Sequence, residues 1–260
     1  MTHRPSPHSE SSRTDAFVTV VTGAAGDIGA EICRTLATHS ATVVAVDRVE
    51  APDLASQIRS AGSQPLVVKA DVSNPEDVRR MAQEVGAECG RVDVLVNAAA
   101  VYRSLWRGTW SDIPVEEWDR TFAVNVRGVW LCCQALVPLM TSAGGSIVNI
   151  ASTVFHKGPT DMMHYAASKA AVCAISSALA RALGPRGVRV NTLLPGLVED
   201  QATTELLGAE RARSSAGGRA LGRNVAAREV ADAVAFLATA QSSGVDGAAL
   251  VVDAGGLCDF

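Results

Sequence analysis

Short apolar runs rich in β-branched residues alternate with longer stretches of helical pattern along almost the whole chain. Seven of these runs predict buried strands, at residues 17–22, 41–46, 65–70, 92–96, 146–151, 188–194 and 248–252. Helices are predicted between them, at residues 30–37, 54–61, 75–88, 114–140, 165–183 and 229–240. Strands that alternate with helices predict an α/β fold, a doubly wound sheet of about seven parallel strands with helices on both faces, in a single domain.

Composition narrows the class of protein. The chain has 260 residues, is 48% hydrophobic and 19% charged, and carries a net charge of −4. That length is sufficient for one large domain with a buried core. Because the chain is mildly acidic and has no basic stripe, we expect no nucleic acid partner. The first residues lack the apolar segment of a signal peptide and no run of about 18 apolar residues predicts a membrane span, so we expect a cytoplasmic protein.

The ends and the cysteines add little chemistry. Residues 1–14 are rich in Ser, Pro and His and are predicted to form a disordered tail, which leaves residues 15–260 for the domain. The six cysteines show neither a CxxC pair nor the spacing of metal ligands. They are expected to be reduced and buried, and no metal site is predicted.

A glycine-rich turn follows the first predicted strand. Residues 23–29 read GAAGDIG and precede a predicted helix, whose N-terminal N–H groups and dipole favour a bound phosphate. Asp47 ends the second strand 18 residues after Gly29, close to the roughly 20-residue spacing at which an acid binds the adenosine ribose. Its carboxylate would repel a 2′-phosphate, which predicts NAD over NADP, although Arg48 could weaken this preference. The alternative is an ordinary solvated carboxylate at a strand end.

Three polar side chains converge farther along the chain. Tyr165 and Lys169 lie one helical turn apart on the same face of a predicted helix. Ser152 follows the strand at 146–151, at the carboxyl edge of the sheet, where ligands bind in such folds. A phenol, an ammonium group and a hydroxyl in one crevice are suited to moving a proton. Asn125, in the middle of a predicted helix, would by itself be read as an ordinary exposed residue.

These motifs together resemble the short-chain dehydrogenase/reductase family. The similarity covers residues 16–256 and rests on TGAAGDIG at 22–29, NAAA at 97–100, Asn125, Ser152, YAASK at 165–169 and PG at 195–196. It implies a Rossmann-type fold and hydride transfer to or from NAD(P). It also implies that Tyr165 is the general acid or base, and that Lys169 lowers the Tyr165 pKa and holds the nicotinamide ribose. Ser152 would hold the substrate oxygen, and Asn125 would keep a water in a proton relay.

The resemblance also implies where the cofactor binds. The residues expected to contact it are Gly23, Asp27, Ile28, Gly29, Asp47, Arg48, Asp71, Val72, Asn97, Ala98, Ala99, Tyr165, Lys169, Pro195, Gly196 and Val198. Four features depart from the family pattern. Asp27 replaces a glycine and is expected to turn away from the pyrophosphate, capping its helix. Ala98 and Ala100 replace an asparagine and a glycine, Asp200 replaces a threonine at the nicotinamide amide, and Ala254 is additional in the ending VDAGG.

The expected substrate contacts are mostly apolar. They are Ser152, Val154, Met162, Tyr165 and Leu197, with Tyr102, Trp106, Thr153, Phe155, Met163 and His164 as further candidates. An apolar lining favours a hydrophobic secondary alcohol or ketone, and several stretches are similar to NAD-dependent aryl-alkyl alcohol dehydrogenases of the family. Two alternatives are an NADPH-dependent 3-oxoacyl-carrier-protein reductase and a non-catalytic dinucleotide-binding redox sensor. Residues 197–223 are predicted to form a mobile substrate lid.

Two predicted helices carry more than one apolar face. These are the helices at 121–140 and 166–183, and a helix apolar on two faces is usually buried on both. The family commonly pairs such helices between subunits. We therefore expect a homotetramer, with a homodimer as the alternative.

Overall fold

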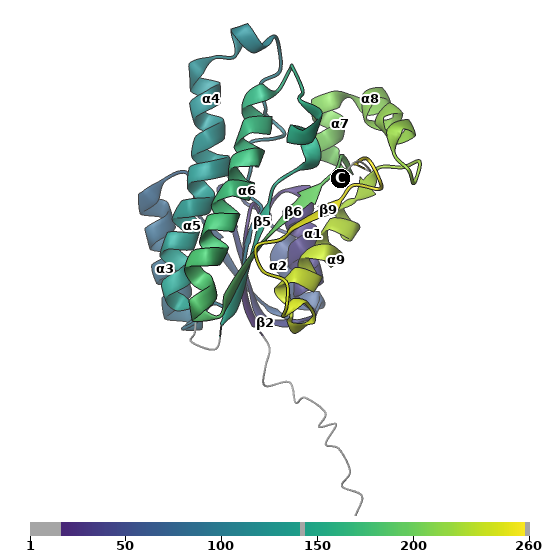
Figure 1. Ribbon diagram of the computed structural model, residues 1–260. Coiled ribbons are helices and arrows are strands. Elements are labelled where there is room, and N and C mark those ends of the chain that lie inside the picture. The colour runs from purple at the N-terminus through teal and green to yellow at the C-terminus, as the bar shows by residue number, and fades with distance from the viewer. Residues whose placement is uncertain (1–16, 141–143, 258–260) are drawn as a thin grey trace, which may run out of the picture.

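Seven parallel strands form the central sheet of the protein (Figure 1). The computed structural model describes residues 17–140 and 144–257, and only the backbone of residues 211–213. The predicted tail at 1–14 lies outside the described residues. The strands are β1 (Phe17–Thr22), β2 (Ser40–Asp47), β3 (Gln64–Lys69), β4 (Val94–Asn97), β5 (Gly145–Ile150), β6 (Val188–Pro195) and β9 (Ala249–Val252). The predicted doubly wound α/β fold is confirmed.

The strand order places a crevice at the centre of the sheet. Along the sheet the order is β3-β2-β1-β4-β5-β6-β9, so β1 pairs with β2 on one side and β4 on the other. The chain winds outward in opposite directions from this point, and helices on opposite faces diverge there. Ligands of open α/β sheets bind at such a switch point, outside the carboxyl ends of the strands.

Helices cover both faces of the sheet (Figure 1). On one face lie α3 (Pro75–Cys89), α5 (Gly128–Leu136) and α6 (Met163–Leu183), which pack their apolar residues against one core cluster. On the other face lie α1 (Asp27–Leu36), α2 (Leu54–Ser60) and α9 (Ala227–Ala238), which bury a second cluster. Central strands such as β4 are buried on both faces, which explains their continuous apolar runs.

The helix predicted at 114–140 is continuous but irregular. It consists of α4 (Val115–Phe122), a π-helical turn (Ala123–Arg127), α5 and a 3₁₀ turn (Val137–Leu139). A π turn accommodates one extra residue and frequently marks a functional position. Periodicity did not reveal it, because the whole run remains helical and a single π turn is shorter than the window over which periodicity is judged.

The segment predicted as a lid, residues 197–223, is ordered into short elements. It contains β7 (Val198–Glu199), α7 (Gln201–Leu207), α8 (Ala209–Ser214) and a 3₁₀ turn (Ser215–Gly218). β7 pairs with β8 (Val225–Ala226), which anchors the segment to the start of α9. Figure 1 shows α7 and α8 standing above the carboxyl edge of the sheet.

Two helical runs are long and apolar enough, by length and composition alone, to cross a membrane. They are Val115–Leu139 and Met163–Arg186. In this structure both runs contribute residues to the core and α6 packs beside β6, as core helices that meet the same criterion do.

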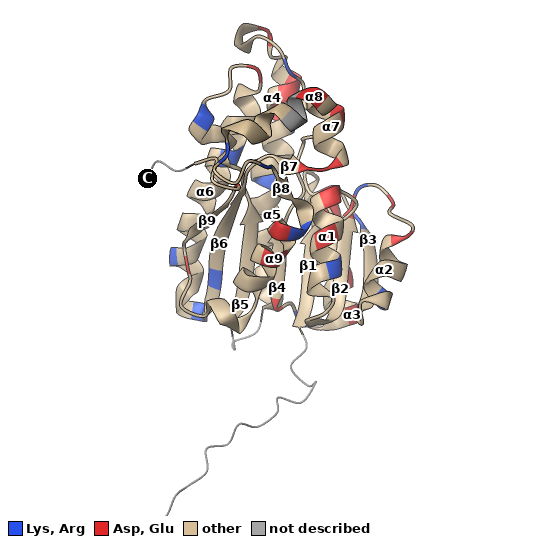
Figure 2. Cartoon of the chain, turned by 90° about the vertical axis from the view of Figure 1, so that its right-hand side faces the viewer, with Lys and Arg blue, Asp and Glu red and all other residues tan. Residues whose placement is uncertain are grey.

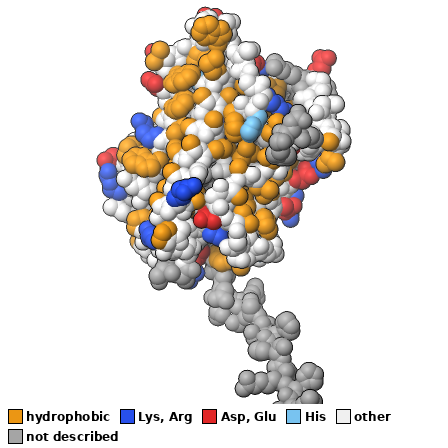
Figure 3. Space-filling view, viewed as in Figure 1, with side chains coloured by type: hydrophobic (Ala, Val, Ile, Leu, Met, Phe, Trp, Pro, Cys, Tyr) orange, Lys and Arg blue, Asp and Glu red, His pale blue; other side chains and the backbone are white. Residues whose placement is uncertain are grey.

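The surface is mixed in charge, but one side is apolar. Figure 2 shows basic and acidic residues interspersed over the face in view. Figure 3 shows hydrophobic side chains gathered over the side formed by α4, α5 and α6. Val115, Trp118, Trp130 and Met163 on these helices are exposed by 37–69%.

Candidate active site

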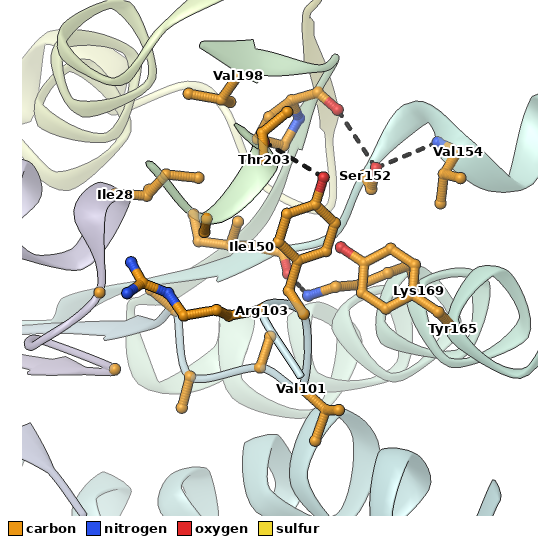
Figure 4. A pocket seen from close by; sticks show the side chains of 18 of the residues that line it. Ile28, Val101, Arg103, Ile150, Ser152, Val154, Tyr165, Lys169, Val198 and Thr203 are labelled. Atoms are coloured by element: carbon orange, nitrogen blue, oxygen red, sulfur yellow. Dashed lines mark hydrogen bonds between the residues drawn. The ribbon is translucent and has the colours of Figure 1, made fainter. Parts of the chain in front are cut away.

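A cleft of about 580 Å³ runs along the carboxyl edge of the sheet, from the turns after β2 and β3 to the lid segment. Every residue predicted to contact the cofactor lines it except Asn97, and so does every predicted substrate residue in the primary set. Figure 4 shows Ser152, Tyr165 and Lys169 within this cleft, with Val198 and Thr203 above them. The fold therefore brings together residues that lie far apart in the sequence.

The glycine-rich turn forms one wall of the cleft. Gly23 has φ +70°, and a Cβ there would lie 2.7 Å from the backbone of Ala99. A Cβ on Gly29 would lie 2.0 Å from the carbonyl oxygen of Gly23. Gly26 caps α1 without a side-chain hydrogen bond, so N–H groups of the first helical turn stay available. This close-packed backbone at a helix N-terminus is the geometry that binds a pyrophosphate.

Asp47 is fixed at the end of β2. Its Oδ2 accepts a hydrogen bond from the backbone N–H of Ala25 at 3.0 Å, and its Oδ1 accepts one from Val49 at 3.1 Å. These bonds tie the carboxylate to the glycine-rich turn, and Asp47 lines the cleft with acceptor capacity to spare. Arg48 lines the same end of the cleft.

Asn97 does not face the cleft. Its amide nitrogen donates to Oδ1 of Asn149 at 2.8 Å, on the face of the sheet that α5 covers, and the residue is only 3% exposed. Its neighbours Ala98 and Ala99 do line the cleft, and their backbone N–H groups donate to Oγ1 of Thr22. The cleft wall at this strand end therefore consists of backbone and methyl groups, while the Asn97 side chain is directed to Asn149.

Tyr165 and Lys169 lie in the first turns of α6. Lys169 Nζ donates to the carbonyl oxygen of Ile150 at 2.8 Å and lies 5.7 Å from the centre of the Tyr165 ring (Figure 4). The ring of Tyr102 packs beside Tyr165, with 5.5 Å between ring centres. Both Tyr165 and Lys169 are less than 10% exposed. The predicted helical spacing thus places the phenol and the ammonium group side by side.

Burial disfavours charge on both groups. It lowers the pKa of Lys169 to about 8. Burial also raises the pKa of Tyr165, and nearby Tyr102 and Asp200 raise it further. In the protein without cofactor, desolvation of the phenolate thus outweighs the expected lowering of the Tyr165 pKa by Lys169.

Ser152 follows β5 and begins a 3₁₀ turn (Thr153–Lys157). Its Oγ accepts a hydrogen bond from the N–H of Val154 at 3.2 Å. The hydroxyl donates to the carbonyl oxygen of Pro195 at 3.4 Å, which is long for an O–H···O bond (Figure 4). This donor is therefore weakly engaged and can turn toward a substrate oxygen.

Asn125 lies in the π-helical turn and is buried rather than exposed. Its Oδ1 accepts from the N–H of Val101 at 2.8 Å, and its Nδ2 donates to Oγ of Ser168 at 3.0 Å. The side chain does not line the cleft. It holds the loop after β4 against α6, one residue before Lys169, so its direct effect is on the position of the lysine.

The two acidic departures from the family pattern both contact the lid segment. Asp27 Oδ2 accepts from the N–H of Ala202 at 2.9 Å and pairs with Arg103 at 3.2 Å, and it makes no helix-capping bond. The expected helix cap is therefore not formed, and the Asp27 carboxylate, which lines the cleft, binds α7 instead. Asp200 Oδ1 accepts from the N–H of Thr203 at 2.7 Å and so caps α7. Burial raises the Asp200 pKa.

Several further substrate candidates lie outside the cleft. Phe155 packs against the core, Met163 is exposed, and His164 is fully buried against Trp118. Trp106 does not line the cleft either, whereas Tyr102 and Thr153 do. Apolar character alone could not separate these residues, because a short loop turn directs neighbouring side chains to opposite sides.

Sequence reasoning missed three arginines of the cleft, Arg120 on α4 and two from irregular segments. Arg103 lies in the loop after β4, and Arg219 lies at the end of the lid segment. Neither occurs in a motif, and both come from irregular segments in which no periodicity indicates the direction of a side chain.

Comparison with known proteins identifies the family. A family model described as enoyl-(acyl carrier protein) reductase matches residues 23–256. The chain is 38% identical over 252 residues to D-threitol dehydrogenase from Mycolicibacterium smegmatis, covering 94% of each chain. It is 36% identical over 240 residues to cis-4-hydroxycyclohexanecarboxylate dehydrogenase from Sinomonas cyclohexanicum, covering 92% of this chain and 95% of that one. It is also 36% identical over 248 residues to 3-oxoacyl-(acyl-carrier-protein) reductase from Thermotoga maritima, covering 94% and 98%.

Solved structures with a similar fold support the same family assignment. Carveol dehydrogenase from Mycobacterium avium in complex with NAD superposes with a TM-score of 0.87 at 27% identity, covering 95% of this chain and 99% of that chain. A blue fluorescent protein from a metagenomic library in complex with NADPH superposes with a TM-score of 0.86 at 31% identity, covering 93% and 98%. The chain therefore belongs to the short-chain dehydrogenase/reductase family. It is an oxidoreductase of the short-chain type.

Proposed function

We propose that this protein reversibly transfers a hydride between NAD(H) and a hydrophobic secondary alcohol or ketone. The observation that carries the proposal is the meeting of Tyr165, Lys169 and Ser152 in one cleft whose opposite end is built from a glycine-rich turn and a fixed carboxylate. A redox sensor would need the second feature but has no use for the first.

The residues of the cleft divide the chemistry between them. The nicotinamide cofactor supplies or accepts the hydride. In alcohol oxidation, Tyr165 Oη takes the hydroxyl proton as the carbon gives up its hydride, and in ketone reduction it returns that proton to the oxygen. Ser152 Oγ holds the reacting oxygen. Lys169 holds the nicotinamide ribose and supplies positive charge beside the phenol, which favours the phenolate.

The raised Tyr165 pKa fits this division. Burial opposes phenolate formation in the protein chain itself, and Lys169, with a pKa near 8, is only partly protonated in alkaline solution. The positive charge of a bound oxidised nicotinamide would favour the phenolate and so offset the cost of burying it. Proton abstraction is thereby coupled to the presence of the oxidised cofactor.

The choice of cofactor depends on Asp47. A carboxylate fixed at the end of β2 suits the two ribose hydroxyls as hydrogen-bond donors and repels a 2′-phosphate. This supports NAD over NADP, and Arg48, which lines the same end of the cleft, could weaken that preference. Relatives in complex with NAD and with NADPH share this fold, so the preference depends on the side chains and not on the architecture.

The substrate end is mainly apolar. Val154, Met162, Leu197, Val198 and Leu207 line it. Such a lining favours an alicyclic or aromatic alcohol over a sugar phosphate. Dehydrogenation of a ring alcohol is also the activity in the name of the Sinomonas relative. The lid segment would close this end over the substrate.

A second candidate is NADPH-dependent reduction of a 3-oxoacyl group on a carrier protein. Reduction of such a group is the activity in the name of the Thermotoga relative. An anionic carrier would approach the mouth of the cleft, where the lid carries Glu199, Asp200 and Glu205. These acids would repel it, so we favour the small-molecule alcohol.

The apolar side formed by α4, α5 and α6 supports self-association (Figure 3). Trp130 on α5 is 46% exposed and Met163 on α6 is 41% exposed. Burying them against the same helices of another copy would give a homotetramer or a homodimer. Light scattering at micromolar concentration tests this proposal, and a monomer contradicts it.

The test of function is an assay of ketones and alcohols, run in parallel with NAD(H) and NADP(H). We expect turnover of hydrophobic secondary alcohols with NAD, and a loss of several orders of magnitude in Tyr165→Phe with NADH binding retained. Turnover that survives in Tyr165→Phe contradicts the catalytic assignment. Binding of NADH without turnover of any substrate would favour the redox sensor.

A further inference from the structure

Arg219 is a buried cation that the mechanism does not use. It is 6% exposed, although it lies in an irregular segment just after the 3₁₀ turn at Ser215–Gly218. Its Nε donates to Oδ1 of Asn224 at 3.0 Å, and its Nη1 donates to the backbone carbonyl oxygen of Asp253 at 2.7 Å. Among the described residues, Nη2 has no hydrogen-bond partner, and the guanidinium forms no ion pair.

The nearest acid, Asp253, is only half committed elsewhere, because its Oδ2 is buried without a hydrogen-bond partner among the described residues. Oδ1 of Asp253 accepts the backbone N–H groups of Gly255 and Gly256 at 3.0 Å each. The Asp253 charge supports that of Arg219, but of the Asp253 oxygens only the backbone one accepts a hydrogen bond from the guanidinium. A guanidinium has five N–H donors in a planar fork, and a buried one whose donors are partly unused is costly unless an anion completes it.

Arg219 lines the cleft at the end opposite the adenosine. A Cβ built on Gly196 would lie 2.7 Å from Arg219 Nη1, so the guanidinium lies against the turn that leaves β6. Asp253 immediately follows β9, the edge strand at the opposite end of the sheet from β3. Of the acids at the adenosine end, Asp47 ends β2 and Asp71 follows β3. An anion at Arg219 would therefore belong to the substrate and not to the adenosine half of the cofactor.

Other charges at this end leave the site receptive to an anion. Asp161 is paired with Arg107, and Asp200 caps α7. Lys157 also lines the cleft and adds positive charge.

We propose that Arg219 binds a carboxylate of the substrate, so that the preferred substrates are hydrophobic secondary alcohols or ketones that carry an acidic group. This proposal rests on the proposed function and specifies its substrate class. The planar fork suits a carboxylate, which takes two parallel N–H donors, and the apolar lining contacts the carbon skeleton between the carboxylate and the reacting oxygen.

The experiment compares oxo acids with their neutral methyl esters. The pairs are 4-oxocyclohexanecarboxylate, 4-acetylbenzoate and 5-oxohexanoate, each with its ester, in wild type, Arg219→Gln and Arg219→Lys. We expect wild type to prefer at least one acid over its ester by about ten- to a hundredfold in kcat/KM, the worth of one charge-assisted hydrogen bond. Arg219→Gln should lose that preference, while its kcat/KM for the ester should change less than about threefold. Arg219→Lys should retain part of the preference.

A binding measurement separates this proposal from turnover. Benzoate is titrated calorimetrically into the protein with saturating NAD, and we expect binding in wild type and none in Arg219→Gln. Arg223→Gln is the matched control, because Arg223 carries the same charge four residues away and pairs with exposed Glu229 outside the cleft.

Three results overturn the proposal. They are wild-type protein that binds no benzoate, esters that match their acids in every pair, or Arg219→Gln lowering acid and ester equally, which would make Arg219 a structural clamp between the lid and β9. If no ketone is reduced at all, the proposed function fails, whereas benzoate binding still decides the role of Arg219.

Discussion

The carboxylate of Asp27, at the start of α1, accepts a 2.9 Å hydrogen bond from the backbone N–H of Ala202, at the start of α7. The same oxygen pairs with Arg103, whose Nε also reaches Glu205 on α7 at 3.3 Å. The turn that would hold the pyrophosphate and the segment that would cover the substrate are thus joined directly across the cleft. A glycine at position 27 has no carboxylate and could not form this link.

Asp27→Ala should loosen α7 with little change in global stability. The ion pair with Arg103 is partly exposed, so its loss should change the free energy of unfolding by less than about 1 kcal/mol. The Ala202 amide, however, loses its acceptor and should exchange its hydrogen faster, which exchange measured by mass spectrometry over residues 201–207 would detect. Glu76→Ala removes a comparable exposed pair with Arg79 and is the control. Unchanged exchange in α7 would show that the link does not hold the lid.

Asp47 should decide the cofactor preference. We expect wild type to favour NADH over NADPH in kcat/KM by at least about tenfold, since a fixed carboxylate repels the 2′-phosphate. Asp47→Ser should move the ratio toward NADPH, because Arg48 then faces the phosphate unopposed. Adding Arg48→Ala should reverse part of that gain. Equal use of both cofactors by wild type would contradict the role given to Asp47. The melting temperature of Asp47→Ser must be followed, since Ala25 and Val49 lose an acceptor.

Lys169 should make stability depend on pH in a defined direction. Its pKa is about 8 in the folded protein and 10.5 when exposed. Between these values the unfolded chain binds a proton that the folded chain does not, so the free energy of unfolding rises with pH in this window. Below pH 8 the lysine is protonated in both states, so the pH dependence ends there and the cost of burying the charged ammonium group is fully present.

The measurement is the difference in unfolding free energy between wild type and Lys169→Met, by reversible urea denaturation without cofactor. It should increase from pH 8 toward pH 10 by at most about 1.4 kcal/mol per pH unit. Tyr165 is present in both proteins, so its own titration largely cancels. A difference that stays flat or falls would mean that Lys169 keeps its ordinary pKa.

Ala254→Gly should stabilise the protein. Ala254 has φ +57° and is the one non-glycine residue with positive φ in the described part of the chain. The left-handed region costs an L-residue about 1–2 kcal/mol, of which the flexibility of glycine in the unfolded chain returns about half. We therefore expect a gain of about 0.5–1 kcal/mol, measured by thermal unfolding. Ala249→Gly, in β9, should change stability in the opposite sense. A loss of stability in Ala254→Gly would show that its methyl group packs too well to remove.

The sequence by itself determined the alternation of strands and helices, the glycine-rich turn and the pairing of Tyr165 with Lys169. These features depend on local rules: apolar periodicity, the need for a missing Cβ at Gly23 and Gly29, and the 3.6-residue turn of a helix. Most of the expected cleft residues were implied by the family resemblance, and they meet in space because parallel strands bring their carboxyl ends to one edge.

Only the tertiary structure decided which way side chains turn where no such rule applies. Asn97, the last residue of β4, points to the face of the sheet that α5 covers. Asn125 holds the loop after β4 from a π turn that periodicity does not reveal. Asp27 meets Ala202 across 175 positions, and Arg219 reaches the cleft from an irregular segment. Contacts between distant segments depend on how whole elements pack, and the pattern along one segment carries no information about its partner.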